Sequence, residues 1–334
     1  MAYTVTYRRH ACQFFFVNNM SGWHFACFPH YNEAWIQETG PLTKEETEAL
    51  EAFADIAREY GYGPDWLGRP FVAAPSEEQA LTDTEQLIGA AYAETLKDVL
   101  EVMEPRFARI WAADEPRLIA LSHRIEAPLQ SEGMARAVAV AERLYGTQLS
   151  DLEVLLVLSR GRRSISGGAN EGPGRIILAA LEADDTQSII EIVLHESIHL
   201  LESVGFQEMY RRISRAHGLE DIKGYKFWDA HHLVREAILG ALVPGGVLAP
   251  LLGGTIRDFA SEAKQQRAAG RTTYADLTAL AGYYVPLLQE YIDAGRRIDA
   301  ELAERAVEVF KERLGELAIG SSETRRQEGS EAPR

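Results

Sequence analysis

The stretch Ile189 to Leu201, with the sequence IIEIVLHESIHLL, is the feature that most constrains the fold of this chain. It contains no proline, and besides Ile189 and Ile190 it has apolar or uncharged residues at positions 192, 193, 194, 197, 198, 200 and 201. A helix that is apolar on nearly every side is buried in a protein core. We therefore expect a buried helix here, and Ser188 with Glu191 could form a capping box at its start.

Two histidines and a glutamate interrupt this helix in the order His195-Glu196-Ser197-Ile198-His199. Residues four apart lie one above the other on the same helical face, so both imidazoles can reach one metal ion. Unpaired histidines are costly to bury, and a metal ion would supply the missing partner. Glu196, beside that face, could take a proton from a zinc-bound water without ligating the metal. The pattern predicts a zinc site, and the plainer alternative is a core helix with hydrogen-bonded histidines.

The run from Ile192 to Leu201 resembles the extended signature of the zincin metallopeptidases, in which uncharged residues flank the motif and a hydrophobic residue follows the second histidine. The resemblance covers roughly residues 150 to 245. It implies a zinc-dependent hydrolase that acts on a peptide or protein substrate. It also implies that the strand before the motif helix, Arg175 to Ala180, lies at the edge of the sheet and pairs with the substrate. An ordinary interior strand is the alternative.

A catalytic zinc site needs a third protein ligand. In the metzincin branch it would be a histidine six residues after His199, where this chain has Gly205, so that branch is excluded. The gluzincin branch takes a glutamate from a later helix, and Glu236 lies in a stretch with helical spacing that ends before Pro244. Many gluzincins carry an aspartate four residues further on, where this chain has Gly240. Support for the ligands must then come from elsewhere.

His232 lies four residues before Glu236 on the same helical face. It could orient the glutamate, donate a hydrogen bond to the substrate oxyanion, or be the third ligand itself. We assign His195, His199 and Glu236 as the zinc ligands. Glu196 and His232 are assigned as catalytic residues. The other candidate ligands are His231, Asp229, Glu202 and His217, and the other candidate oxyanion donors are Tyr225, Tyr274, Tyr283 and Tyr284.

The order of expected elements predicts an α+β fold, mostly helical, with a small mixed sheet packed on the motif helix as in zincins. Residues 1–150 are expected to form an N-terminal β-hairpin, built from TVTY, QFFFV and WHFACF, followed by helices. Among these, Thr43 and Glu46 predict a capping box that starts a helix, a second helix is expected to end at Pro105, and a third is expected over 131–145.

Residues 151–319 are expected to form the zincin-like catalytic region. It would contain a buried strand, LEVLLVLS, then a glycine-rich loop over 167–174, the strand at 175–180 and the motif helix. Residues 320–334 have almost no apolar content and are expected to be a disordered tail.

The formal net charge of −16 argues against nucleic acid or an anionic membrane surface as a partner. No run approaches the ~18 to 20 apolar residues that cross a bilayer, and no signal peptide is evident, so a cytoplasmic location is expected. Oligomeric state and substrate specificity do not follow from the sequence. An alternative to a peptidase is a zincin-fold binding or regulatory protein that keeps zinc but cleaves little.

Overall fold

The computed structural model describes residues 1–334 except 25, 61–63, 162–164, 171–173, 220–228 and 314–334. It is mostly helical with one small mixed sheet, which agrees with the expected α+β class. The chain forms two compact units, one of residues 1–130 and 150–196 and one of residues 131–149 and 197–334. This division differs from the expected boundary at 150 because the N-terminal strand belongs to the sheet formed after that residue. The expected tail at 320–334 lies outside the described residues.

The sheet has four strands, β1 (Tyr3–Tyr7), β2 (Leu152–Val157), β3 (Ser166–Asn170) and β4 (Arg175–Ala179), in the order β1-β2-β4-β3. β1 with β2 and β2 with β4 are parallel, and β3 is antiparallel to β4. The expectation that the strand at 175–180 lies at the edge is wrong, since β4 pairs on both sides. The edge strand beyond it is β3, which comes from the glycine-rich segment expected to be a loop. Backbone pairing needs no side chains, so glycine weakens a strand without forbidding it.

The expected N-terminal hairpin is also wrong. β1 pairs in parallel with β2, and the run QFFFV lies in helix α1 (Arg9–Ser21). α1 is buried on most of its sides, including Cys12, Phe14 and Phe16. An apolar run buried all round lacks the helical period that would distinguish it from a buried strand.

The other helices that precede β2 in the first unit are α2 (Pro29–Thr39), α3 (Lys44–Tyr60), α4 (Pro64–Ala73), α5 (Glu77–Ile88) and α6 (Ala90–Leu129). The predicted capping box of α3 is confirmed, because the Glu46 N–H donates to Thr43 Oγ1 at 3.1 Å and the Thr43 N–H donates to Glu46 Oε2 at 2.8 Å. The predicted end at Pro105 is wrong. The buried stripe of α6 continues beyond it with Phe107, and buried Arg106 donates to both oxygens of Glu46 at 2.8 and 2.7 Å. This packing outweighs the cost of proline in a helix, ~3 kcal/mol.

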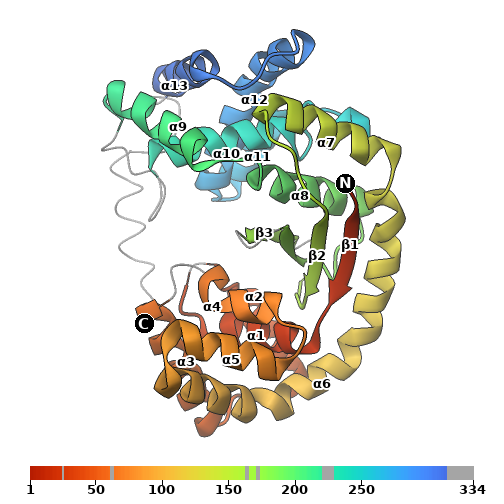
Figure 1. Ribbon diagram of the computed structural model, residues 1–334, viewed down its shortest axis with the longest axis vertical. Coiled ribbons are helices and arrows are strands. Elements are labelled where there is room, and N and C mark those ends of the chain that lie inside the picture. Colours follow the sequence, from red (N-terminus) through yellow and green to blue (C-terminus); the bar gives the residue numbers. More distant parts are fainter. Residues whose placement is uncertain (25, 61–63, 162–164, 171–173, 220–228, 314–334) are drawn as a thin grey trace. The chain divides into compact units, whose positions relative to one another are not determined.

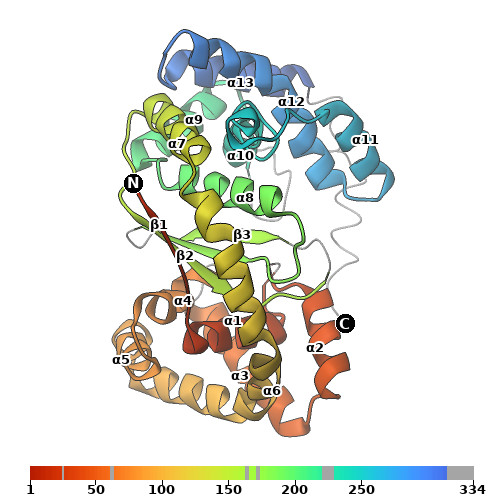
Figure 2. The same cartoon turned by 90° about the vertical axis from the view of Figure 1, so that its right-hand side faces the viewer.

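Helices cover both faces of the sheet in the first unit (Figure 1, Figure 2). α1 and α4 lie along one face, and α8 (Thr186–His199) lies along the other. On the α1 face, a buried cluster joins side chains from the helices and from β2 and β4. Its members are Ala11, Val72, Leu155, Val157, Ile177 and Ala179, with Phe15 packed against them. The sheet on which α8 packs is therefore held on its other face by this buried cluster.

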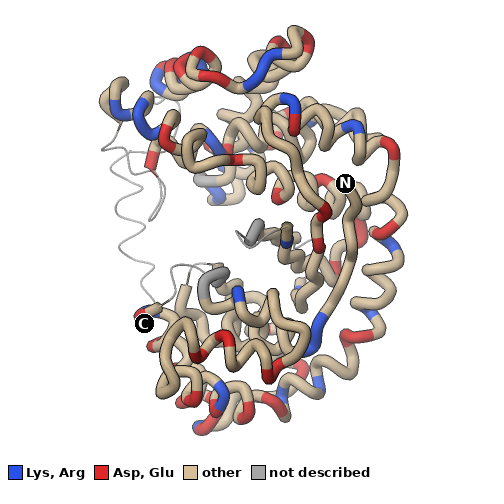
Figure 3. Tube along the Cα trace, viewed as in Figure 1, with Lys and Arg blue, Asp and Glu red and all other residues tan. Residues whose placement is uncertain are grey.

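The second unit contains α7 (Glu132–Tyr145), α9 (Val204–Ala216), α10 (Ala230–Leu242), the 3-10 turn Ala249–Leu252, α11 (Phe259–Ala268), α12 (Thr272–Asp293) and α13 (Ala300–Arg313). α7 confirms the helix predicted at 131–145. α10 is the most deeply buried of these helices for which every residue is described, and it packs against α9 and α12. Asp and Glu are interspersed with Lys and Arg along the helices (Figure 3). Among the described helices, none is long and apolar enough to cross a membrane.

Candidate metal centre

His195 and His199 lie one turn apart on α8, which runs without interruption from Thr186 to His199. The predicted buried helix is confirmed, with Val193, Leu194 and Ile198 fully buried and the two histidines half-buried. Its start differs in detail from the expected capping box. Asp185 accepts the Gln187 N–H at 3.0 Å, and Ser188 Oγ donates to the same carboxylate.

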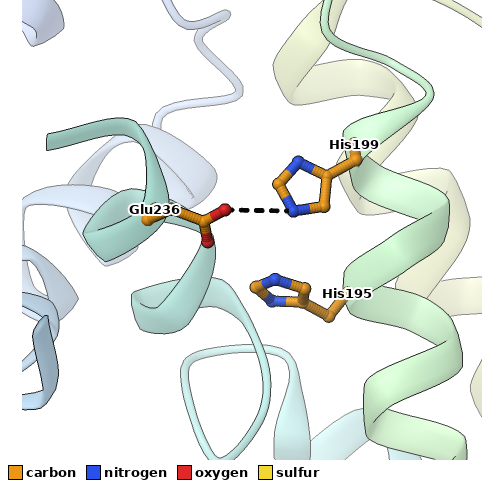
Figure 4. A group of neighbouring side chains, drawn as sticks. All are labelled: His195, His199 and Glu236. Atoms are coloured by element: carbon orange, nitrogen blue, oxygen red, sulfur yellow. Dashed lines mark ion pairs between the residues drawn. The ribbon is translucent and has the colours of Figure 1, made fainter. Parts of the chain in front are cut away.

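Glu236 of α10 faces both histidines (Figure 4). His199 Nε2 lies 3.4 Å from Glu236 Oε1, and one ligand atom from each of the three residues lies within 4.8 Å of the others. Ligands bound to zinc at about 2.0–2.2 Å in a tetrahedron lie about 3.4 Å apart. Two imidazole nitrogens and one carboxylate oxygen also leave a fourth position open, as catalytic zinc requires. The residues therefore fit a zinc ion.

Glu202 supports His199 from the opposite side of the ring. His199 Nδ1 lies 3.5 Å from Glu202 Oε2, and Arg235 forms an ion pair with the same carboxylate. Burial of Glu202 opposes ionisation, but hydrogen bonds from His199 and Arg235 outweigh it and hold the pKa of this carboxyl below its ordinary value. A charged carboxylate on Nδ1 directs Nε2 toward Glu236. Glu202 is thus placed to orient a ligand rather than to be one.

Gly240, where many gluzincins have an aspartate, packs against α12. A Cβ atom at this position would lie 3.3 Å from the Ala281 Cβ. A larger side chain there would meet α12 rather than His199. The support that the sequence left unassigned comes from Glu202 instead.

His232 lines a cavity of about 80 Å³ together with His199, Arg235 and Glu236. Its Nδ1 lies 2.9 Å from Asp229 Oδ1, and Asp229 also caps α10 by accepting the His232 N–H at 3.3 Å. His232 therefore lies at the same cavity as two of the expected ligands, His199 and Glu236.

His231 faces away into a separate cavity of about 200 Å³ that Arg211, Ser214 and Arg215 also line. Its ring is buried and its Nδ1 contacts Asp229. Burial, followed by the neighbouring His232, lowers the pKa of His231 from 6.5 to about 4.

Glu196 lies over the backbone of the edge strand β3. It is 9% exposed, and a Cβ atom at Gly167 would lie 2.6 Å from its Cγ and 2.8 Å from its Oε1. A side chain at position 167 would therefore displace the Glu196 carboxylate. The sequence does not predict this contact, because consecutive glycines after a strand are typical of a turn.

The remaining candidates lie elsewhere or outside the described residues. His217 forms an ion pair with Glu304 at 2.6 Å, and the buried Tyr284 hydroxyl donates to the Ala306 carbonyl. Tyr283 packs under Arg313 and Tyr274 is 62% exposed. Tyr225 is not among the described residues.

Tyr145 of α7 was not singled out from the sequence, where it belongs to an ordinary helical stripe. Its buried hydroxyl has no hydrogen-bond partner among the described residues. Burial raises its pKa well above the ordinary value, and the charges of Glu202, Arg235 and Glu236 also act on it. It therefore lies close to Glu202, which contacts His199, and to the expected ligand Glu236.

No family model, curated protein or solved structure matches this chain. The chemistry of the site is therefore inferred from its own residues.

Proposed function

We propose that this protein is a zinc-dependent metallopeptidase of the gluzincin type, with zinc held by His195, His199 and Glu236. The observation that carries the proposal is the convergence of these three ligand atoms within 4.8 Å of one another. The adjacent Glu196, placed against an edge strand, supplies the base that peptide hydrolysis needs.

When bound, zinc supplies a Lewis acid that polarises the scissile carbonyl and lowers the pKa of water to around 7. Glu202 keeps the His199 ring in the orientation that binding requires. Arg235 neutralises Glu202, so a second negative charge does not compete with Glu236 for the ligand role.

Glu196 accepts the proton of the attacking water and then delivers it to the leaving amine. Its position over Gly167 supports a proton transfer beside the edge strand β3. An extended peptide that pairs with β3 would pass beside the carboxylate, since an edge strand offers unpaired N–H and C=O groups.

His232 is the residue best placed to donate to the developing oxyanion. Asp229 fixes its ring through Nδ1, and in the protonated imidazole Nε2–H is then the remaining donor. The proposed substrates are peptides or proteins.

The test compares Glu196→Gln, His199→Ala and the control Glu208→Gln, which changes an exposed glutamate paired with Arg211. We expect Glu196→Gln to keep stoichiometric zinc and lose about 10²- to 10⁴-fold in kcat. His199→Ala should lose the metal, and Glu208→Gln should retain both zinc and activity. Zinc content is measured by elemental analysis and cleavage with a broad peptide library.

An active Glu196→Gln protein would contradict this mechanism. Stoichiometric zinc in the wild type without cleavage of any library peptide would favour the alternative, a zincin-fold binding or regulatory protein.

A further inference from the structure

A cavity of about 170 Å³ lies in the first unit on the α1 face of the sheet. Phe15, Phe28 and Tyr31 form its aromatic walls, and Val157 and Ile177 of the sheet form its floor. Ser166 and Gly168 of the edge strand β3 line it as well. The cavity is therefore an apolar pocket that reaches the strand beside Glu196.

Two asparagines also line this pocket, but their side chains are already engaged in holding its wall. Asn18 Oδ1 accepts from Trp23 Nε1 at 2.8 Å. Asn19 Oδ1 accepts from the Phe28 N–H at 2.8 Å, and its Nδ2 donates to Asn32 at 2.7 Å. These bonds fix the segment that carries Phe28 and leave the aromatic and aliphatic groups to define the pocket.

The strand register connects the pocket to the base. Ser166 pairs with Ala179 and Gly168 pairs with Ile177, so both face the α1 side of the sheet, where the pocket lies. Gly167, between them, pairs with Leu178 and faces Glu196 on the other side. Because side chains alternate along a strand, a peptide added to β3 would alternate in the same way. Its residue opposite Gly167 faces the base, and the flanking residues face the pocket.

We propose that this pocket receives a bulky apolar side chain, of leucine to phenylalanine size, from a peptide substrate paired with β3. The proposal rests on the proposed peptidase function and names its substrate class: peptides with such a residue next to the one opposite Gly167. A cavity of about 150 Å³ lined by apolar side chains holds a benzene ring, so a phenyl group fits here. A charged side chain would lose its hydration without gaining an oppositely charged partner, since no charged residue is among the described residues that line the pocket.

The first measurement profiles the bond cleaved in a peptide library and then compares two peptides that differ only in phenylalanine or alanine at the favoured position. We expect kcat/KM for the wild type to favour phenylalanine by about 10- to 100-fold. Ser166→Leu places a side chain into the pocket from β3 and should bring this ratio close to one. Ser150→Leu, an equivalent change at an exposed position, should leave the ratio unchanged.

Phe28→Ala provides an independent variant, since it enlarges the pocket and should move the preference from phenylalanine toward tryptophan. Thermal unfolding of each variant establishes that it is folded. The proposal is overturned if the wild type shows no apolar preference at any position. It is also overturned if folded Ser166→Leu keeps the full preference.

Binding separates failure of the pocket from failure of the peptidase proposal. The Glu196→Gln protein is titrated with the same two peptides carrying a fluorescent label. Tighter binding of the phenylalanine peptide, with no cleavage by the wild type, would contradict the peptidase function and support the pocket. Cleavage by the wild type with equal binding of both peptides would support the peptidase function and overturn the pocket.

Discussion

Gly167 illustrates how one residue of the edge strand controls the proposed base. An added Cβ would lie 2.6 Å from Glu196 Cγ, a separation at which the glutamate side chain must move. We expect Gly167→Ala to reduce kcat by up to about 10²-fold, because small displacements of catalytic groups have effects of this size. Zinc content should stay stoichiometric, since none of the three ligands touches this position in the contacts described.

The matched control is Gly205→Ala on α9, where the nearest atom to an added Cβ, Ser203 Oγ, is 3.8 Å away. It should leave kcat unchanged. Unaltered kcat in a Gly167→Ala protein of normal thermal stability would show that Glu196 does not depend on this contact.

The individual site residues differ in how far the sequence could predict them. His195 and His199 follow from local spacing, because a helix fixes the positions of residues four apart. Glu236 follows from helical spacing in a later segment. Glu202 lies three residues after His199, but it also depends on Arg235 at 33 residues' separation, and Gly167 acquires its role only from the side chain of Glu196. Neither contact leaves a local pattern in the chain.

Among the helices, α10 has a histidine near its start, His231, whose protonation should change the free energy of unfolding. Burial, with the neighbouring His232, lowers the pKa of His231 to about 4, so the unfolded chain binds a proton first as pH falls below about 6.5. The stabilisation by neutral His231 is therefore complete above pH 6.5 and is lost between about pH 6.5 and 4. It amounts to at most ~3 kcal/mol.

We expect His231→Phe to flatten the pH dependence of the unfolding free energy in this window. Urea unfolding of the zinc-free protein at several pH values measures it. His123→Gln, which changes an exposed histidine of α6, is the control and should keep the wild-type slope between pH 6.5 and 4. Identical slopes for His231→Phe and the wild type would contradict the assignment.

The elements that the sequence predicted correctly have strong local signals. α3 has a reciprocal cap between Thr43 and Glu46, and α7 has a Ser131 cap and a regular apolar stripe. α1 and α6 lack such signals, because α1 is buried nearly all round and α6 passes through Pro105 by virtue of packing with α3. In α1 and α6, tertiary packing therefore determines the helix where the local sequence does not predict it.

For the whole molecule, the sheet explains why a division by sequence position fails. β1 pairs with β2 across 149 residues, for example Thr4 with Glu153, and Thr6 Oγ1 donates to Glu153 at 2.7 Å. Nothing near the N-terminus specifies this parallel partner. Each unit consequently contains separate stretches of the chain, whereas composition and spacing indicate only contiguous regions.

Zinc should contribute to the stability of the folded chain, because its proposed ligands converge only when α8 and α10 are formed. A ligand present at 1,000 times its Kd stabilises the folded state by about 4 kcal/mol. We expect removal of zinc with a chelator to lower the Tm by about 5 to 10 °C and readdition to restore it. Differential scanning calorimetry of the full chain measures the shift.

Glu236→Gln should lose most of the zinc-dependent shift, since it removes the charged ligand while conserving side-chain volume. His217→Gln should keep the full shift, because His217 pairs with Glu304 away from the three ligands. A zinc-dependent shift of wild-type size in Glu236→Gln would exclude this glutamate as a ligand. In that case His232, which lines the same cavity as His199, becomes the third ligand to test.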